Sequence, residues 1–311
     1  MPLFHFMHNK YIFIFLSLLF VNGVAWAQAE IRVTDDRGQS VTLRAPAQRI
    51  ISLAPHITEN LYAIGAGDQV VGVVAFSDYP PEAQALPQVG DFANLNIERI
   101  LSLKPDLVVA WIDGTSPEQL ARLEAFGIPV LRESPDTFAE IAQAMRRLGQ
   151  LAGRNGEAEA VAADIETRIT HLQQRYAQQR PLHVFYQLWH KPLMTANHSQ
   201  LVDRMIRLCG GKNLFASRPE VAPTVNLEAV IAADPDLILS AVEQHDAGWR
   251  ETWEPWPHMR AVKYQHLYSV DADLVHRATA RAVQGAEQIC SKLAQARAQL
   301  HQQQSNGEAT R

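Results

Sequence analysis

Aromatic side chains follow several short apolar runs of strand length, and they are the first candidates for binding chemistry. They are Phe76, Tyr79, Phe92, Trp111 and Trp189. Aromatic rings suit a large, flat or apolar ligand, because each buries roughly 150–250 Å² of surface. A single ring at a strand end more often packs in the core, and we interpret Tyr79, beside Pro80, in this way. Several rings on one rim instead favour a ligand site.

Three histidines occupy similar positions after predicted strands, namely His56, His190 and His276. Imidazoles from three loops could bind Zn²⁺ or a similar ion, whereas His276 with the adjacent Arg277 could meet an anionic or amide group. No close pair such as His-x-His supports ligation, so we expect no metal and keep a metal-ion receptor as an alternative. His183 lies within a predicted strand and is interpreted as a core residue.

The sequence lacks the motifs that are typical of catalysis. The run 65–72 (GAGDQVVG) resembles a dinucleotide loop, but its third glycine is displaced and it follows a predicted helix rather than a strand. No Gly-x-Ser-x-Gly elbow is present. We therefore expect a binding protein without a cofactor, and an exported hydrolase is the alternative from another class.

Composition and charge narrow the class of partner. The chain has 311 residues, of which 47% are hydrophobic and 20% charged, which is typical of a globular protein of about two domains. Its formal net charge is −5. Nucleic acid is excluded as the expected partner, because binding a phosphate backbone requires a concentrated basic surface.

The two ends of the chain indicate its location. Residues 1–27 read as a signal peptide, with an apolar run at 11–20 followed by the small-x-small pattern Ala-Trp-Ala at 25–27. That run is well below the ~20 residues needed to cross a bilayer. We expect cleavage after Ala27 and a soluble periplasmic product, with an uncleaved anchor as the alternative. Residues 302–311 lack apolar side chains and predict a disordered tail.

The chain has two cysteines, Cys209 and Cys290, and their expected redox state depends on export. In an oxidising compartment two cysteines favour a disulfide over a metal pair or a nucleophile. Two buried free thiols are the alternative.

Apolar runs of strand length alternate with helical patterns through most of the chain, which predicts an α/β fold with parallel sheets covered on both faces. The expected strands are 49–53, 70–74, 107–111, 128–131, 182–188, 237–240 and 267–270. The expected helices are 57–64, 97–103, 117–126, 138–151, 156–179, 200–208 and 278–300.

A segment of fourteen residues recurs within the chain. Residues 96–109 and 226–239 share Asn, Glu, Pro and Asp in register, at an offset of 130. Each copy predicts an amphipathic helix, a Pro-Asp turn and a strand. We infer two Rossmann-like lobes, at 28–152 and 181–301, joined by one long helix at 153–180. The alternative is that the unit is simply a common crossover. Two such lobes enclose a cleft, which the carboxyl ends of the strands face.

Glu98 and Glu228 occupy equivalent places in the two copies, near the start of each helix. A carboxylate there is favoured by the helix dipole by about 0.3–1 kcal/mol, which is the structural explanation. One matched carboxylate per lobe also suits docking onto paired basic residues of a symmetric partner, because complementary charges set orientation and association rate.

Beyond these patterns, residues 48–295 resemble the cobalamin-binding branch of the helix-linked (class III) substrate-binding proteins of ABC importers. The resemblance rests on 52–55 (SLAP), 77–81 (SDYPP), 96–100 (NIERI), 104–107 (KPDL), 110–111 (AW), 209–215 (CGGKNLF), Arg277 and Cys290. It implies that Phe76, Phe92 and Trp111 contact a corrin ring. It further implies that Asp273 and Arg277 make polar contacts from the second lobe and that Cys209 and Cys290 form a disulfide. The same resemblance implies that Glu98 and Glu228 are the carboxylates that dock onto the permease. The chain departs from the family at Ala222 and Leu274, where tryptophan is common.

We therefore expect a monomeric, non-enzymatic receptor that captures cobalamin or a related corrinoid and delivers it to the permease dimer of an ABC importer. The expected ligand site is Phe76, Phe92, Trp111, Trp189, His190, Asp273, His276 and Arg277. A haem or ferric siderophore receptor is the alternative within the class.

Overall fold

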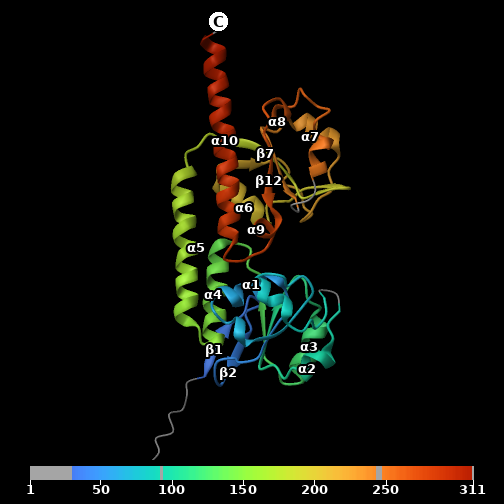
Figure 1. Cartoon of the computed structure of the whole chain (residues 1–311), viewed down its shortest axis with the longest axis vertical. Helices are drawn as coiled ribbons and strands as arrows, with labels where there is room; N and C mark the ends of the chain where they lie inside the picture. Colours follow the sequence, from blue (N-terminus) through green and yellow to red (C-terminus); the bar gives the residue numbers. More distant parts are fainter. Residues whose placement is uncertain (1–29, 92–93, 243–246, 310–311) are drawn as a thin grey trace, which may run out of the picture.

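The computed structural model describes residues 30–91, 94–242 and 247–309, which form two α/β lobes stacked along the long axis of the molecule (Figure 1). The first sheet has the order β4-β3-β5-β6 and the second the order β10-β7-β11-β12, and all their pairings are parallel. The first sheet comprises β3 (Ile50–Ser52), β4 (Val70–Val73), β5 (Leu107–Trp111) and β6 (Val130–Glu133). The second comprises β7 (Leu182–Gln187), β10 (Gly211–Asn213), β11 (Leu237–Val242) and β12 (Leu267–Asp271). The expected fold class, two Rossmann-like lobes with parallel sheets, is confirmed.

Helices and two small antiparallel hairpins complete the lobes. The hairpins are β1 (Ile31–Thr34) with β2 (Ser40–Leu43), and β8 (Trp189–His190) with β9 (Leu193–Met194). The helices up to the second sheet are α1 (Pro55–Ala63), α2 (Ile97–Ser102), α3 (Pro117–Ala125), α4 (Phe138–Ala152) and α5 (Asn155–Tyr176). The later helices are α6 (Leu201–Leu208), α7 (Leu227–Ala233), α8 (Arg260–Lys263), α9 (Ala272–His276) and α10 (Ala282–Ala309). Short 3₁₀ helices lie at Gly67–Gln69, Pro81–Ala85 and Ala247–Thr252.

Both faces of each sheet are buried, as the uninterrupted apolar runs require. On β5, Leu107 and Val109 belong to one apolar cluster while Val108 faces a second cluster on the other side of the sheet. On β11, Leu239 joins the first of these clusters and Ile238 joins a third. The first cluster therefore runs continuously from one lobe to the other.

The connection between the lobes is a packed helical layer. Gly153 ends α4 with a φ of +70°, a conformation that glycine adopts without strain, and α5 then runs back along α4 (Figure 1). Ala158, Ala162 and Ile165 of α5 are buried in the shared core. At 22 residues α5 is about 33 Å long. It leads from the first lobe to the second, as predicted for a linking helix.

The internal repeat is visible in the hydrogen bonding of both lobes. In the first lobe the Asp106 carboxylate accepts the backbone N–H of Arg49, and in the second the Asp236 carboxylate accepts that of His183. The residue two before each aspartate has a positive φ, +47° at Lys104 and +43° at Asp234. These pairs tie β3 to β5 and β7 to β11, so the two sheets are built in the same way.

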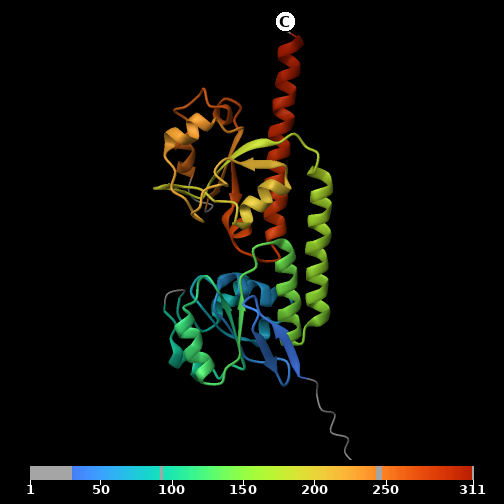
Figure 2. The ribbon, with the colours of Figure 1, turned by 180° about the vertical axis from the view of Figure 1, so that it is seen from behind.

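The ends of the chain and the cysteines complete the fold. The disulfide joins Cys209 and Cys290, so α6 is linked to α10, as expected. In contrast, the helix α10 runs to Ala309 and projects beyond the second lobe (Figure 2), where the sequence predicts a disordered tail. That expectation is wrong for 302–309, because polar residues such as glutamine continue a helix without an apolar face. The signal peptide at 1–27 lies outside the described residues. Within the described part of the chain, none of the helices combines the length and the apolar character needed to cross a membrane.

Candidate functional site

A cavity of about 680 Å³ opens between the two lobes and is lined by residues of both. The first lobe contributes the ends of β5 and β6 and the start of α1, and the second contributes the end of β7, the start of α6 and the segment after α9. These residues include His56, Trp111, Asp113 and Asp136 on one side and Leu188, Gln200, His276 and Arg277 on the other. The cleft predicted from the strand ends therefore exists, and it brings together residues more than 200 positions apart in the chain.

On the first lobe, Trp111 and His56 form one wall of this interlobe cavity. Trp111 ends β5 and is 37% exposed, and His56 occupies the first turn of α1, which begins at Pro55. The two rings meet edge to face with centroids 5.7 Å apart. Burial, and to a lesser extent the charge of Arg277, lower the pKa of His56 to about 4. The imidazole is therefore neutral near pH 7, and the two rings together present an aromatic surface beside the carboxylates of Asp113 and Asp136.

On the second lobe, His276 is held by Tyr186. The hydroxyl of Tyr186 lies 2.5 Å from His276 Nε2, and Tyr186 is fully buried in β7. Which of the two groups donates this hydrogen bond depends on the tautomer of the imidazole. Desolvation by the surrounding protein lowers the pKa of His276 to about 4. His276 therefore lines the cavity as a neutral ring at neutral pH.

Arg277 is placed by carboxylates from both lobes. Its guanidinium lies 2.9 Å from Asp78 of the first lobe and 3.1 Å from Asp273 of its own lobe. Burial raises the pKa of Asp273, an effect that the charge of Arg277 opposes. Arg277 lines the interlobe cavity and brings a cationic group that is able to meet an amide or anionic oxygen. Asp273 lines neither this cavity nor the one lined by Trp189, and it contacts Arg277 instead.

Next to Arg277, a second arginine fixes the spacing of the lobes. Arg281 makes two hydrogen bonds with Glu59 of α1, at 2.7 and 2.8 Å, and its guanidinium lies 3.4 Å from the centre of the Tyr79 ring. Asn60 donates to the carbonyl of Ala278 at 3.1 Å. Tyr79 thus takes part in interlobe packing and does not line the interlobe cavity.

Another cavity, of about 530 Å³, lies within the second lobe and is lined by Trp189, His190, Pro192, Met194 and Trp249 among others. It shares Leu188 and His276 with the interlobe cavity. Trp189 is 55% exposed on β8. The predicted residues Trp189 and His190 therefore lie beside the interlobe cavity rather than in it.

The remaining expected residues lie elsewhere or outside the described part of the chain. Phe76 follows β4, is 73% exposed and lines neither cavity. Phe92 falls outside the described residues. His183 was expected in the core, but it is exposed, because the pleat of β7 turns it away from its buried neighbours. Leu274 is buried in α9.

Two groups of residues that line the interlobe cavity are not among those predicted from the sequence. Ser134, Pro135 and Asp136 line the interlobe cavity directly after β6. They obey the same strand-end pattern as Trp111 and could have been found by applying it to 128–131. Ser199 and Gln200 also line it, at the start of α6. No local signal marks them, because their position depends on how the second lobe folds back over the first.

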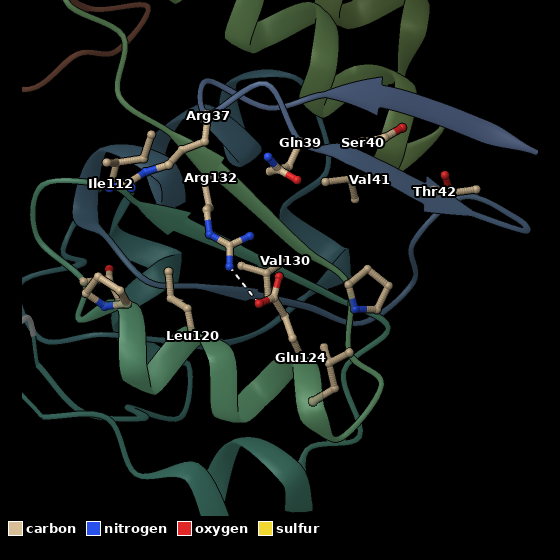
Figure 3. A pocket seen from close by; sticks show the side chains of 14 residues that line it. Arg37, Gln39, Ser40, Val41, Thr42, Ile112, Leu120, Glu124, Val130 and Arg132 are labelled. Atoms are coloured by element: carbon tan, nitrogen blue, oxygen red, sulfur yellow. Dashed lines mark ion pairs between the residues drawn. The ribbon is translucent and has the colours of Figure 1, made fainter.

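A further cavity, of about 550 Å³, lies away from the cleft between the β1–β2 hairpin, β6 and α3 (Figure 3). An ion pair between Arg132 and Glu124, at 2.8 Å, lies across it, and its lining comes from the first lobe alone. It therefore lacks the opposed surfaces that the interlobe cavity provides.

The histidines do not form a metal centre in the part of the chain that the structure describes. His56 and His276 line the interlobe cavity, whereas His190 lines the neighbouring one. Within residues 30–91, 94–242 and 247–309, no three His, Cys, Asp or Glu side chains come together as a metal would need.

Comparisons with known proteins agree with this geometry. Residues 50–274 match a family model described as periplasmic binding protein. A vitamin B12-binding protein of Vibrio cholerae is 36% identical over 249 residues, which are 80% of this chain and 90% of that protein. A vitamin B12-binding protein of Photorhabdus laumondii is 36% identical over 255 residues, which are 82% and 90% of the two chains.

Solved structures show the same arrangement of lobes. The crystal structure of the periplasmic vitamin B12 binding protein BtuF of Vibrio cholerae has a TM-score of 0.74 at 36% identity and covers 81% of this chain and 98% of that one. The periplasmic heme-binding protein RhuT from Roseiflexus sp. RS-1 has a TM-score of 0.71 at 28% identity, covering 80% and 99%.

Proposed function

The chain belongs to the periplasmic binding protein family, and we propose that it is the receptor of an ABC importer that captures cobalamin or a closely related corrinoid between its lobes. The observation that carries the proposal is the interlobe cavity of about 680 Å³, in which the rings of Trp111 and His56 on one lobe face the Arg277 guanidinium and the His276 ring on the other. A corrin ring has a broad apolar face and a periphery of amide groups, which these two surfaces match. The similarity to vitamin B12-binding proteins at 36% identity supports the same ligand.

In this proposal Trp111 contacts the face of the ring, while Arg277 and His276 donate to peripheral amide oxygens. Asp273 orients Arg277 through their 3.1 Å ion pair. Phe76 and Phe92 are assigned as further ring contacts on the strength of the family resemblance alone.

Calorimetric titration with cyanocobalamin tests the function, with haemin and Zn²⁺ as comparators. We expect submicromolar binding of cyanocobalamin, and tighter binding of haemin would instead favour the alternative supported by the heme-binding relative. Trp111→Ala is expected to weaken cyanocobalamin binding by more than about tenfold, as for a buried aromatic anchor. Unchanged affinity in this variant would remove Trp111 from the site.

Delivery to a permease dimer is the second part of the proposal. Glu98 and Glu228 are exposed in the first turns of α2 and α7, which Asn96 and Asn226 cap in the same way. Both helices lie on the side of the molecule opposite α5 (Figures 1 and 2). One receptor could thus present two carboxylates at once to paired basic residues of a symmetric partner.

The docking role is tested by Glu98→Ala combined with Glu228→Ala. This variant is expected to bind cobalamin normally but to lose uptake in cells that depend on the importer. Glu157→Ala is the matched control, because Glu157 occupies the first turn of α5 on the other side of the molecule. Uptake at the wild-type rate by the double variant would refute the docking surface.

We also propose that the chain acts as a monomer in the periplasm after cleavage following Ala27. Mass spectrometry of the protein recovered from the periplasm would show a mature chain that begins at Gln28. A chain that retains residues 1–27 would show that the segment is an anchor instead.

A further inference from the structure

The interlobe cavity carries more negative than positive charge. Among the described residues that line it, Asp113 and Asp136 bring carboxylates, whereas Arg277 brings a guanidinium as the single permanent cation. His56 and His276 also line the cavity, but burial lowers the pKa of both to about 4, so both are neutral near pH 7. Two carboxylates therefore stand against one guanidinium around the space that a ligand would fill.

The positive charge of Arg277 is already compensated by protein carboxylates. Its guanidinium lies 2.9 Å from Asp78, 3.1 Å from Asp273 and 3.9 Å from Glu59. Glu59 is shared with Arg281, at 2.7 Å. The three carboxylates outnumber the two arginines, so Arg277 can donate hydrogen bonds to a ligand but brings no free positive charge to it.

Asp113 and Asp136 are not compensated in this way. In the part of the chain that the structure describes, neither carboxylate forms an ion pair, and Asp113 accepts a hydrogen bond from the hydroxyl of Ser134. Burial raises the pKa of Asp136, the charges of Glu140 and Asp113 raise it further, and the charge of Arg204 opposes them. Negative charges are therefore already crowded on this side of the cavity, and a further one would be repelled.

This distribution of charge distinguishes two classes of flat ring ligand. A ring with carboxylate side chains, such as haem with its propionates, would lose hydration here without gaining a free cation, and it would face like charges. A ring with amide side chains carries no such charge. Each amide can donate through its NH₂ group to Asp113 or Asp136 and can accept through its oxygen from Arg277.

We propose that the cleft carboxylates make this receptor selective for a corrinoid whose peripheral groups are uncharged amides. Asp113 and Asp136 are the specificity-determining residues, because they repel an acidic group on the ring edge. Asp78 lines neither the interlobe cavity nor the second-lobe cavity and acts through Arg277, which makes it a positioning residue. The inference rests on the proposed function and adds to it the property by which ligands are rejected.

The test compares cyanocobalamin with its monocarboxylic acids, in which one peripheral amide is hydrolysed to a carboxylate. Calorimetric titration at pH 7 gives the ratio of the two dissociation constants, acid over amide, in which any effect common to both ligands cancels. Two like charges about 6 Å apart weaken binding by about threefold in water-like surroundings and by roughly 100-fold at the effective dielectric constant near a protein surface. Because each isomeric acid places its charge at a different point of the ring edge, the isomers are titrated separately. We expect a ratio of at least about five for one or more of them.

The methyl ester of the same acid is the matched ligand control, because it lacks the amide but carries no charge. It is expected to bind more tightly than the acid. An ester that binds as weakly as the acid would show that the lost amide, rather than the added charge, weakens binding, and would overturn the inference.

Variants of the protein identify the residues responsible. Asp113→Asn combined with Asp136→Asn keeps the shape of both side chains but removes their charge, and it should lower the ratio by at least about threefold. Asp78→Asn should lower the ratio by at least about twofold, because Arg277 then offers an uncompensated charge to the acid. A purely structural role of Asp78 would weaken both ligands and leave the ratio unchanged. Glu157→Gln is the control, because Glu157 is exposed in the first turn of α5 and lines neither cavity, so the ratio should stay at its wild-type value.

The outcomes separate this inference from the proposed function. If the wild type does not bind cyanocobalamin, the proposed function fails and the inference fails with it. If the wild type binds cyanocobalamin and every monocarboxylic acid equally well, or if the Asp113 and Asp136 double variant keeps the wild-type ratio, the charge selectivity is refuted while the receptor function stands. An unchanged ratio in Asp78→Asn would overturn the positioning role of that residue.

Discussion

The interlobe pair between Arg281 and Glu59 should carry a large share of the stability of the two-lobed state. Glu59 is 3% exposed, and both of its oxygens accept hydrogen bonds from Arg281, at 2.7 and 2.8 Å. Removing one partner of a buried ion pair leaves an uncompensated charge, which costs about 3–5 kcal/mol. Arg277 lies 3.9 Å from Glu59 and offsets part of this loss. We therefore expect Arg281→Ala to lower the free energy of unfolding by about 3 kcal/mol.

Thermal and urea unfolding of the purified protein would measure this effect. A loss of about 3 kcal/mol corresponds to a decrease in Tm of roughly 5 °C for a chain of this size. Arg146→Ala is the matched control, because Arg146 pairs with Glu159 and Glu166 on the exposed surface of α4 and α5. Exposed pairs of this kind contribute at most about 1 kcal/mol.

A double-mutant cycle decides whether the effect belongs to the pair. Glu59→Gln with Arg281→Ala should be less destabilised than the sum of the two single variants, by about 1–3 kcal/mol, because the double variant buries no orphan charge. Strict additivity, or a Tm change no larger than that of Arg146→Ala, would refute the reasoning.

Two further predictions concern stability. Burial, reinforced by Asp36 and opposed by Arg147, raises the pKa of Glu133 from its ordinary 4.5 to about 7. The stabilising contribution of the protonated group is present below pH 4.5 and is lost as the pH rises through 7. In the wild type the free energy of unfolding should therefore fall by up to about 3 kcal/mol between pH 4.5 and 8, and in Glu133→Gln this fall should be absent. Urea unfolding across that range checks this, and an unchanged pH profile would contradict it. Cys209→Ser with Cys290→Ser should lower the free energy of unfolding by up to about 4–5 kcal/mol, because the disulfide closes a loop of 81 residues; a loss below about 1 kcal/mol would show that the link adds little.

Local patterns accounted for the elements of this fold but not for every orientation within them. The run 107–111 predicts β5 and the repeat at 226–239 predicts α7 and β11, because helix caps, Pro-Asp turns and apolar runs act over a few residues. The pleat of β7 already exposes His183, which a simple apolar run does not reveal. The helical continuation of α10 was likewise missed, since a polar segment carries no periodic apolar signal.

The sequence by itself determined that this protein has two similar parallel-sheet lobes, a long connecting helix, and chemistry concentrated after the strands. Only the tertiary structure decided which of those residues meet. Trp111 and His276 share the interlobe cavity although they are 165 positions apart in the chain. Trp189 instead lines the neighbouring cavity of the second lobe, and Phe76 lines neither of the two. The reason is physical. Short-range sterics and hydrophobicity determine where strands end. The relative orientation of the two lobes depends instead on contacts such as that between Arg281 and Glu59, which form only when distant segments have already packed.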